Sequence, residues 1–170
     1  AIFINQLREK IGVMFGCFSY GTMVTLADGT QEKIGKIVNQ KMDVEVLSYD
    51  PELDLVYWGT GNGGPWMGDQ RPGDNLYVAS TVAVNASTGK IVGHFQYSPN
   101  ESFDWDEVSP PLLIDFQRGG RTVKGLVNAA RSGILYFLER TAGPIKFIEA
   151  TPFVRNDVYR GFDPNTGRPD

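Results

Sequence analysis

The stretch LYVASTVAVNASTGKIVGHFQY, residues 76–97, decides the predicted fold of this chain. Two runs rich in β-branched and aromatic residues flank the turn ASTG, and Gly89 at its end can adopt the positive φ that closes a hairpin. The segment VAVNASTGKI within this stretch is similar to YFLERTAGPI further along, where Gly143 takes the place of Gly89. A third turn, DPNTG, ends at Gly167. A repeat of about 50 residues built from such hairpins is typical of propeller blades with four strands each.

On both sides of this stretch the chain contains further short strands separated by turns, and it has no long helical period. The predicted strands lie at 24–35, around a hairpin turn at Asp28-Gly29, and at 43–50, 53–58, 110–116, 121–129 and 134–140. Short strands with frequent turns predict a mainly all-β chain, a partial β-propeller of two to three antiparallel blades. The composition changes near Leu53, so we predict that a small β-rich N-terminal piece ends there.

Composition limits the possible functions. The 170 residues carry a formal net charge of −4 with a pI near 5.0, whereas nucleic-acid-binding domains usually carry a basic surplus. No apolar run approaches the roughly 20 residues that span a bilayer, and no secretory signal pattern is present. The single Cys17 cannot form an internal disulfide. The chain opens without a methionine and inside an apolar run, so we expect a fragment.

The glycine-rich loop GTGNGG, residues 59–64, does not have the context of a phosphate-binding loop. A Walker loop needs Lys followed by Ser or Thr at the start of a helix, whereas Pro65 and Trp66 follow here. The loop is therefore predicted to be a tight turn that presents Asn62. The alternative is a purely structural turn, in which Asn tolerates a left-handed backbone.

The acidic run FDWDE, residues 103–107, places three carboxylates within four positions. Such a run is often only a solvated loop, and it lacks the glycine and distant Glu of an EF-hand. The acidic run is a candidate site because of the order of features along the chain, in which Asn62 precedes the run and Arg131 follows it. The amide oxygen of Asn62 and the carboxylate of Asp104 are hard donors suited to calcium. Arg131 could hydrogen-bond an anionic or quinone cofactor.

Residues 53–170 resemble the quinoprotein alcohol dehydrogenases in LVYWGTGNGGPW, RPGDNLYVASTVAVNASTGKI, FQYSPNESFDWDEV and ARSGILYFLERTAG. These enzymes are eight-bladed propellers that hold pyrroloquinoline quinone (PQQ) and calcium. The resemblance implies that Asn62 binds calcium beside the cofactor. It implies that Asp104 is the general base and also approaches the metal, and that Arg131 contacts the quinone oxygens. It further implies a small alcohol substrate, an electron acceptor and a periplasmic location.

The chain departs from this family at several positions. Ala130 stands where an acidic residue is usual, Gly93 where a blade-docking tryptophan is expected, and Asp106-Glu107 where Asp-Gly is usual. The family's upstream calcium-binding glutamate, adjacent-cysteine disulfide and ring-stacking tryptophan have no counterparts in residues 1–53. We therefore expect the cofactor site to be incomplete and the chain to be inactive alone. Open sheet edges favour self-association.

A second resemblance covers the N-terminal piece. Residues 1–16 are similar to a segment of the recombinase RecA, and residues 17–52, which open with CFSYGTMVTLADGT, are similar to the start of a RecA-type (Hint-like) intein. This implies that Cys17 is the nucleophile of an N-to-S acyl shift in protein splicing, in a cytoplasmic host protein. The alternative is that Cys17 is a buried small hydrophobe.

Residues 1–16 contain no phosphate loop, so we expect no nucleic-acid or nucleotide binding from them. The only histidine, His94, lies in the propeller-like part, so we do not expect splicing to finish. A third hypothesis is a chimeric sequence that has no selected function.

Overall fold

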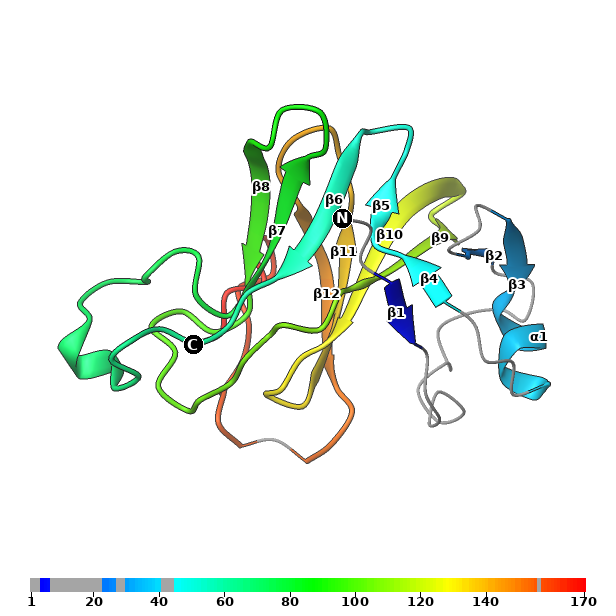
Figure 1. The fold of residues 1–170 in the computed structure, drawn as a ribbon. Coiled ribbons are helices and arrows are strands. Elements are labelled where there is room, and N and C mark those ends of the chain that lie inside the picture. The colour runs from blue at the N-terminus through cyan, green and yellow to red at the C-terminus, as the bar shows by residue number, and fades with distance from the viewer. Residues whose placement is uncertain (1–3, 7–22, 27–29, 41–44, 156) are drawn as a thin grey trace.

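A computed structural model describes residues 4–6, 23–26, 30–40, 45–155 and 157–170, and nearly all of its regular structure is β-strand (Figure 1). Close to the N-terminus, β1 (Ile4–Gln6) pairs antiparallel with β4 (Glu45–Leu47). The mainly all-β prediction is confirmed. A short helix, α1 (Ile34–Asn39), and a 3-10 turn, η2 (Gly68–Gln70), were not predicted.

The first larger sheet has four antiparallel strands in the order β5-β6-β7-β8. Its strands are β5 (Tyr49–Asp50), β6 (Leu55–Gly59), β7 (Ser80–Asn85) and β8 (Ile91–Gln96). The predicted hairpin joins β7 to β8, and the side chain of Asn85 accepts a hydrogen bond from the Thr88 backbone N–H at 2.9 Å. Gly89 has φ +69°, as the turn pattern predicted.

The second larger sheet has six strands in the order β12-β11-β10-β9-β2-β3. Its strands are β12 (Lys146–Pro152), β11 (Ile134–Glu139), β10 (Arg121–Ala129), β9 (Leu112–Arg118), β2 (Met23–Thr25) and β3 (Gln31–Lys33). The antiparallel pairing of β2 with β3 confirms the predicted N-terminal hairpin, although its turn at Asp28-Gly29 lies outside the described residues. The N-terminal hairpin therefore extends the second sheet through the pairing of β2 with β9.

The two larger sheets share one hydrophobic core. The buried cluster takes side chains from both sheets and the loops beside them: Leu55, Tyr57, Ala83, Phe95, Tyr97, Leu113, Leu126, Ala130, Ile134, Tyr136, Leu138 and Ile145. The rings of Tyr97 and Tyr136 meet edge to face with centroids 4.9 Å apart, and Phe95 stacks on Phe147 at 6.1 Å. Burial of this apolar surface is what holds the sheets together.

The hairpin glycines do not all behave alike. Gly167 has φ +69°, like Gly89, whereas Gly143 does not have a positive φ. Instead, the carbonyl of Gly143 packs against β8, because a Cβ placed on Gly93 would lie 2.4 Å from that oxygen. The backbone at Gly143 thus occupies the space next to Gly93, where the family resemblance led us to expect a tryptophan. At Gly93 the backbone of Gly143, and not a side chain, makes the contact between β8 and the loop that leads to β12.

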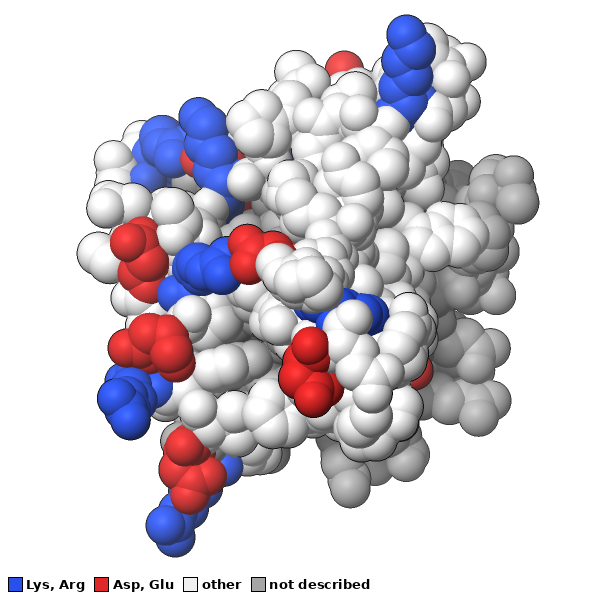
Figure 2. Space-filling view, turned by 90° about the vertical axis from the view of Figure 1, so that its left-hand side faces the viewer, with Lys and Arg blue, Asp and Glu red and all other residues white. Residues whose placement is uncertain are grey.

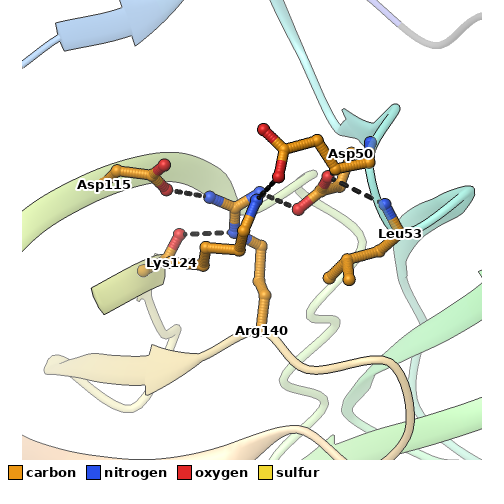
Figure 3. A network of polar contacts seen from close by, with 7 residues as sticks. Asp50, Leu53, Asp115, Lys124 and Arg140 are labelled. Atoms are coloured by element: carbon orange, nitrogen blue, oxygen red, sulfur yellow. Dashed lines mark hydrogen bonds and ion pairs between the residues drawn. The ribbon is translucent and has the colours of Figure 1, made fainter. Parts of the chain in front are cut away.

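An ion-pair network centred on the buried Arg140 fastens the N-terminal segment to the second sheet (Figure 3). Arg140, only 7% exposed, donates to the carboxylates of Asp50 and Asp115 and to the backbone carbonyl of Gly125, the last at 2.9 Å. Asp50 lies in β5, ahead of the predicted segment boundary at Leu53, and β5 pairs with β6. The residues just before the predicted boundary are therefore built into the first sheet.

The described surface carries mixed charge. On the face shown in Figure 2, Lys and Arg side chains are interspersed with Asp and Glu side chains. Several are paired, such as Arg121 with Glu139 at 2.7 Å and Arg168 with Asp74 at 2.6 Å. Within the described residues, no helix is both long enough and apolar enough to cross a membrane.

Candidate functional site

The glycine-rich loop follows β6 and lies directly against the acidic segment, residues 101–107. A Cβ on Gly59 would lie 1.9 Å from the backbone oxygen of Glu107, and one on Gly61 would lie 2.7 Å from Oδ1 of Asp106. The backbone contact leaves no space for a side chain at residue 59, so glycine is required there, whereas a side chain at residue 61 would displace the Asp106 carboxylate. The loop is therefore shaped to receive the acidic segment.

Asn62 and Asp104, which the sequence analysis singled out, lie in contact. The side-chain Nδ2 of Asn62 donates a hydrogen bond to Oδ1 of Asp104. The backbone N–H of Asn62 donates to Oδ1 of Asp106 at 2.8 Å. The carboxylates of Asp104 and Asp106, two positions apart in the acidic segment, thus accept hydrogen bonds from the side chain and the backbone of the same asparagine.

Asp104 lies exposed at the tip of the acidic segment, with a left-handed φ of +62°. The rings of its neighbours, Phe103 and Trp105, stack on each other with centroids 4.5 Å apart. The alternative of a solvated acidic loop thus describes the carboxylate of Asp104. It does not describe Glu101 and Glu107, which are 1% and 3% exposed.

Glu107 connects the acidic segment to Arg131. One carboxylate oxygen accepts the backbone N–H of Arg131 at 2.8 Å, and the other accepts Nδ2 of Asn128 at 3.2 Å. The backbone N–H of Glu107 donates to the carbonyl of Thr60 at 3.1 Å. Burial raises the pKa of Glu107 to about 7. The hydrogen bonds from Arg131 and Asn128 and the positive charge of Arg131 lower this pKa in part.

Arg71 ties the two loops together from the other side. Its guanidinium donates to the backbone carbonyls of Pro65, Trp66 and Glu101 and to the side chain of Asn75. A planar group with five donors can serve several carbonyl groups at once. The glycine-rich loop and the acidic segment are therefore fixed relative to each other on both flanks.

The structure thus brings two of the four predicted site residues into contact and links a third to them only through its backbone. Asn62 touches Asp104, and Arg131 joins them through Glu107, with its own side chain exposed. Cys17 lies outside the described residues. Within the described part of the chain, no group of three or more His, Cys, Asp or Glu side chains could hold a metal ion. The hard oxygen donors at the site are one amide and the neighbouring carboxylates.

Sequence reasoning missed the connecting roles of Glu101, Asp106 and Glu107. It treated the last two as part of the acidic run and as departures from a family pattern. The available signal was their position, because acidic residues flank Asp104 on both sides in the printed sequence. In the structure Asp104 is exposed and Glu107 is buried. The sequence of the five residues 103–107 does not indicate which of their carboxylates is buried.

Comparison with known proteins gives a consistent result for most of the chain. The family described as "Glucose/ethanol/alcohol dehydrogenase, beta-propeller domain" (PQQ) matches residues 29–168. The quinoprotein alcohol dehydrogenase PedH of Pseudomonas putida is 42% identical over 121 residues, which are 71% of this chain and 20% of PedH. A solved europium-containing methanol dehydrogenase is 38% identical with a TM-score of 0.66, covering 71% of this chain and 21% of that one. The predicted partial propeller is thereby confirmed.

This chain therefore spans about a fifth of the length of these relatives. A second kind of match is Protein RecA of Mycobacterium leprae, 55% identical over 106 residues, which are 59% of this chain and 13% of that protein. The predicted likeness to RecA is confirmed as a match. The fractions of this chain that align with RecA and with PedH, 59% and 71%, sum to more than the whole chain, so some residues align with both proteins. The matches alone set no boundary between segments.

Proposed function

This chain belongs to the PQQ family of glucose/ethanol/alcohol dehydrogenase β-propeller domains, and from that premise we propose that it supplies one arc of a PQQ- and calcium-dependent alcohol dehydrogenase site. One observation carries the proposal. A single segment, residues 101–107, contacts Asn62 through Asp104 and anchors Arg131 through Glu107. One segment thus links the side chain of Asn62 to the backbone of Arg131.

The donor chemistry fits a hard cation. Asn62 carries an amide oxygen and Asp104 two carboxylate oxygens, which are the ligands that calcium prefers. In the structure the amide nitrogen of Asn62 faces Asp104, so its side chain would have to rotate to offer the oxygen. Calcium takes about six to eight oxygens, so these two residues provide only part of a coordination sphere. The remaining ligands would come from outside the described residues. We therefore propose that the chain is inactive by itself.

In the proposed mechanism, Asp104 accepts the hydroxyl proton of a small alcohol. Its carboxylate is exposed, and Asn62 holds one of its oxygens. Arg131, whose backbone is fixed by Glu107 and whose side chain is exposed, would hydrogen-bond the quinone oxygens of the bound cofactor. When bound, PQQ supplies the hydride acceptor and calcium supplies a Lewis acid. A separate electron acceptor and a periplasmic location belong to the same proposal.

Europium ions provide a direct test of the metal half of this proposal, because a europium-containing relative aligns with this chain. We expect Eu³⁺ luminescence to increase on addition of the chain, and Ca²⁺ to compete. Asp104→Asn is expected to weaken Eu³⁺ binding by at least about tenfold, since a charged ligand is lost. Asp157→Asn, at an exposed carboxylate outside the site, serves as the matched control. Equal affinities of the two variants would refute the assignment.

The cofactor half is tested by quenching of tryptophan fluorescence with PQQ in the presence of Ca²⁺. Quenching that is weakened in Arg131→Ala but retained in Arg121→Ala would support the role of Arg131. Arg121 is a suitable control because it pairs with Glu139 on the surface. Rapid dye-linked alcohol oxidation by the chain alone would contradict the incomplete site.

The match to RecA favours a second candidate, the N-terminal fragment of an intein within a chimeric chain. In this proposal Cys17 attacks the preceding carbonyl of Gly16 and forms a thioester. Incubation with a small thiol should then cleave the chain between residues 16 and 17. Cleavage should be absent in Cys17→Ala. An intact chain at high thiol concentration would eliminate this candidate.

A further inference from the structure

Glu101 is buried immediately ahead of the exposed turn that carries Asp104. Its side chain is 1% exposed, and the single oxygen Oε1 accepts two backbone N–H groups. The donors are Phe103 and Trp105, the latter at 3.1 Å. These are the residues on either side of Asp104. One carboxylate oxygen thus holds both ends of the three-residue turn.

The turn needs such support. Asp104 has φ +62°, a left-handed conformation that is uncommon outside glycine, although Asp adopts it more often than most side chains do. A backbone of this kind persists only where its surroundings hold it. The stacked rings of Phe103 and Trp105 give one support, and the shared hydrogen bonds to Glu101 give the other.

The position of Glu101 is fixed independently of this turn. Its backbone carbonyl accepts a hydrogen bond from Arg71, which also holds the glycine-rich loop. Its second carboxylate oxygen, Oε2, is buried and has no hydrogen-bond partner within the described residues. Burying a half-satisfied carboxylate opposes folding, so core packing does not explain this side chain. The bonds that it does make all shape the turn.

We propose that Glu101 is the positioning residue for Asp104: its buried carboxylate clamps the flanking amides and so sets the direction in which the Asp104 carboxylate points. This inference rests on the proposed function, in which Asp104 binds metal and accepts the proton of the alcohol. Neither the family matches nor the relatives' names assign a role to Glu101.

The test compares Glu101→Ala with Glu101→Gln in the full chain. Gln keeps an oxygen for the two amides, whereas Ala removes it. We expect Glu101→Ala to weaken Eu³⁺ binding at least about tenfold, as loss of an outer-shell partner typically does, and Glu101→Gln to restore binding close to wild type. Val123→Ala, in the buried part of β10, is the control for general loss of stability and should leave Eu³⁺ affinity unchanged.

A second readout needs no metal. Amide protons that donate to a carboxylate resonate downfield, so the NMR signals of Phe103 and Trp105 should move upfield in Glu101→Ala. The HN–Hα coupling of Asp104 should change with them. Unchanged signals in Glu101→Ala would overturn the inference, whether or not the wild type binds Eu³⁺. If the wild type fails to bind Eu³⁺ while these signals respond, the metal proposal fails and the clamp stands. Equal Eu³⁺ affinity of Glu101→Ala and wild type would remove the positioning role.

Discussion

Glu107 should make the stability of this protein depend on pH. Burial raises its pKa from the ordinary value of 4.5 to about 7, so the folded protein holds this proton more tightly than the unfolded chain does. Below about pH 4.5 both states are protonated, and Glu107 has no effect. As pH rises from about 4.5 to 7, the unfolded chain loses the proton first and is favoured. Stability therefore falls through this window.

The expected magnitude follows from the two values. Each tenfold change in proton affinity is worth about 1.4 kcal/mol, so a rise from 4.5 to about 7 corresponds to about 3 kcal/mol of lost stability above pH 7. The groups that face this carboxyl act in both directions. Arg131 and Asn128 lower its pKa, whereas the charge of Glu101 raises it. The net rise shows that burial outweighs the hydrogen bonds.

The assay is urea denaturation of wild type and Glu107→Gln between about pH 4.5 and 8. The amide keeps an acceptor for the Arg131 N–H but cannot titrate. The two proteins should be similar at the acidic end, and Glu107→Gln should gain up to about 3 kcal/mol over wild type at pH 8. Glu139→Gln, at a more exposed carboxylate whose pKa the Arg121 guanidinium lowers, is the control and should not reproduce this gain. Parallel pH profiles for wild type and Glu107→Gln would refute the reasoning.

Gly93→Ala should lower stability by about 1–3 kcal/mol, because its Cβ would lie 2.4 Å from the carbonyl oxygen of Gly143; an unchanged urea midpoint would show that the two sheets separate easily there. Arg140→Leu leaves Asp50 buried without its cation and should cost about 3–5 kcal/mol by thermal or urea unfolding. Arg121→Leu, which breaks an exposed ion pair, should cost at most about 1 kcal/mol, so equal losses in the two variants would contradict the importance of burial.

Much of the fold could be predicted from local sequence, because hairpin turns are local. The run around Gly89 predicted β7 and β8, and the short runs between turn signals at 110–116, 121–129 and 134–140 predicted β9 to β11. Gly143 shows the limit of this reasoning. Its turn sequence is similar to that of Gly89, yet its backbone serves to pack against Gly93 in the other sheet. Contacts between elements far apart in the chain are not encoded in a turn motif.

The site was predicted in part for a similar reason. Asn62, Asp104 and Arg131 were found through a family resemblance, and the structure adds how they are joined. The join depends on Glu107, whose side chain is buried while Asp104, three residues earlier, is exposed. A run of acidic letters does not show which carboxylates point inward, since the turn at φ +62° decides this.

The segment 101–107 carries four carboxylates, and each one accepts hydrogen bonds. Glu101 accepts two amides of its own turn, Asp104 and Asp106 accept the side chain and backbone of Asn62, and Glu107 accepts an amide of the turn between β10 and β11. Backbone and side-chain N–H groups offset part of the repulsion among the four charges. Of the four, the carboxylate of Asp104 is the exposed one. A cation that binds the folded segment at Asp104 would, by mass action, stabilise the fold that presents this carboxylate. Replacing Asp104 should therefore lower stability when Eu³⁺ is present, whereas replacing Glu107 with Gln should raise stability above about pH 7 because the buried charge is removed.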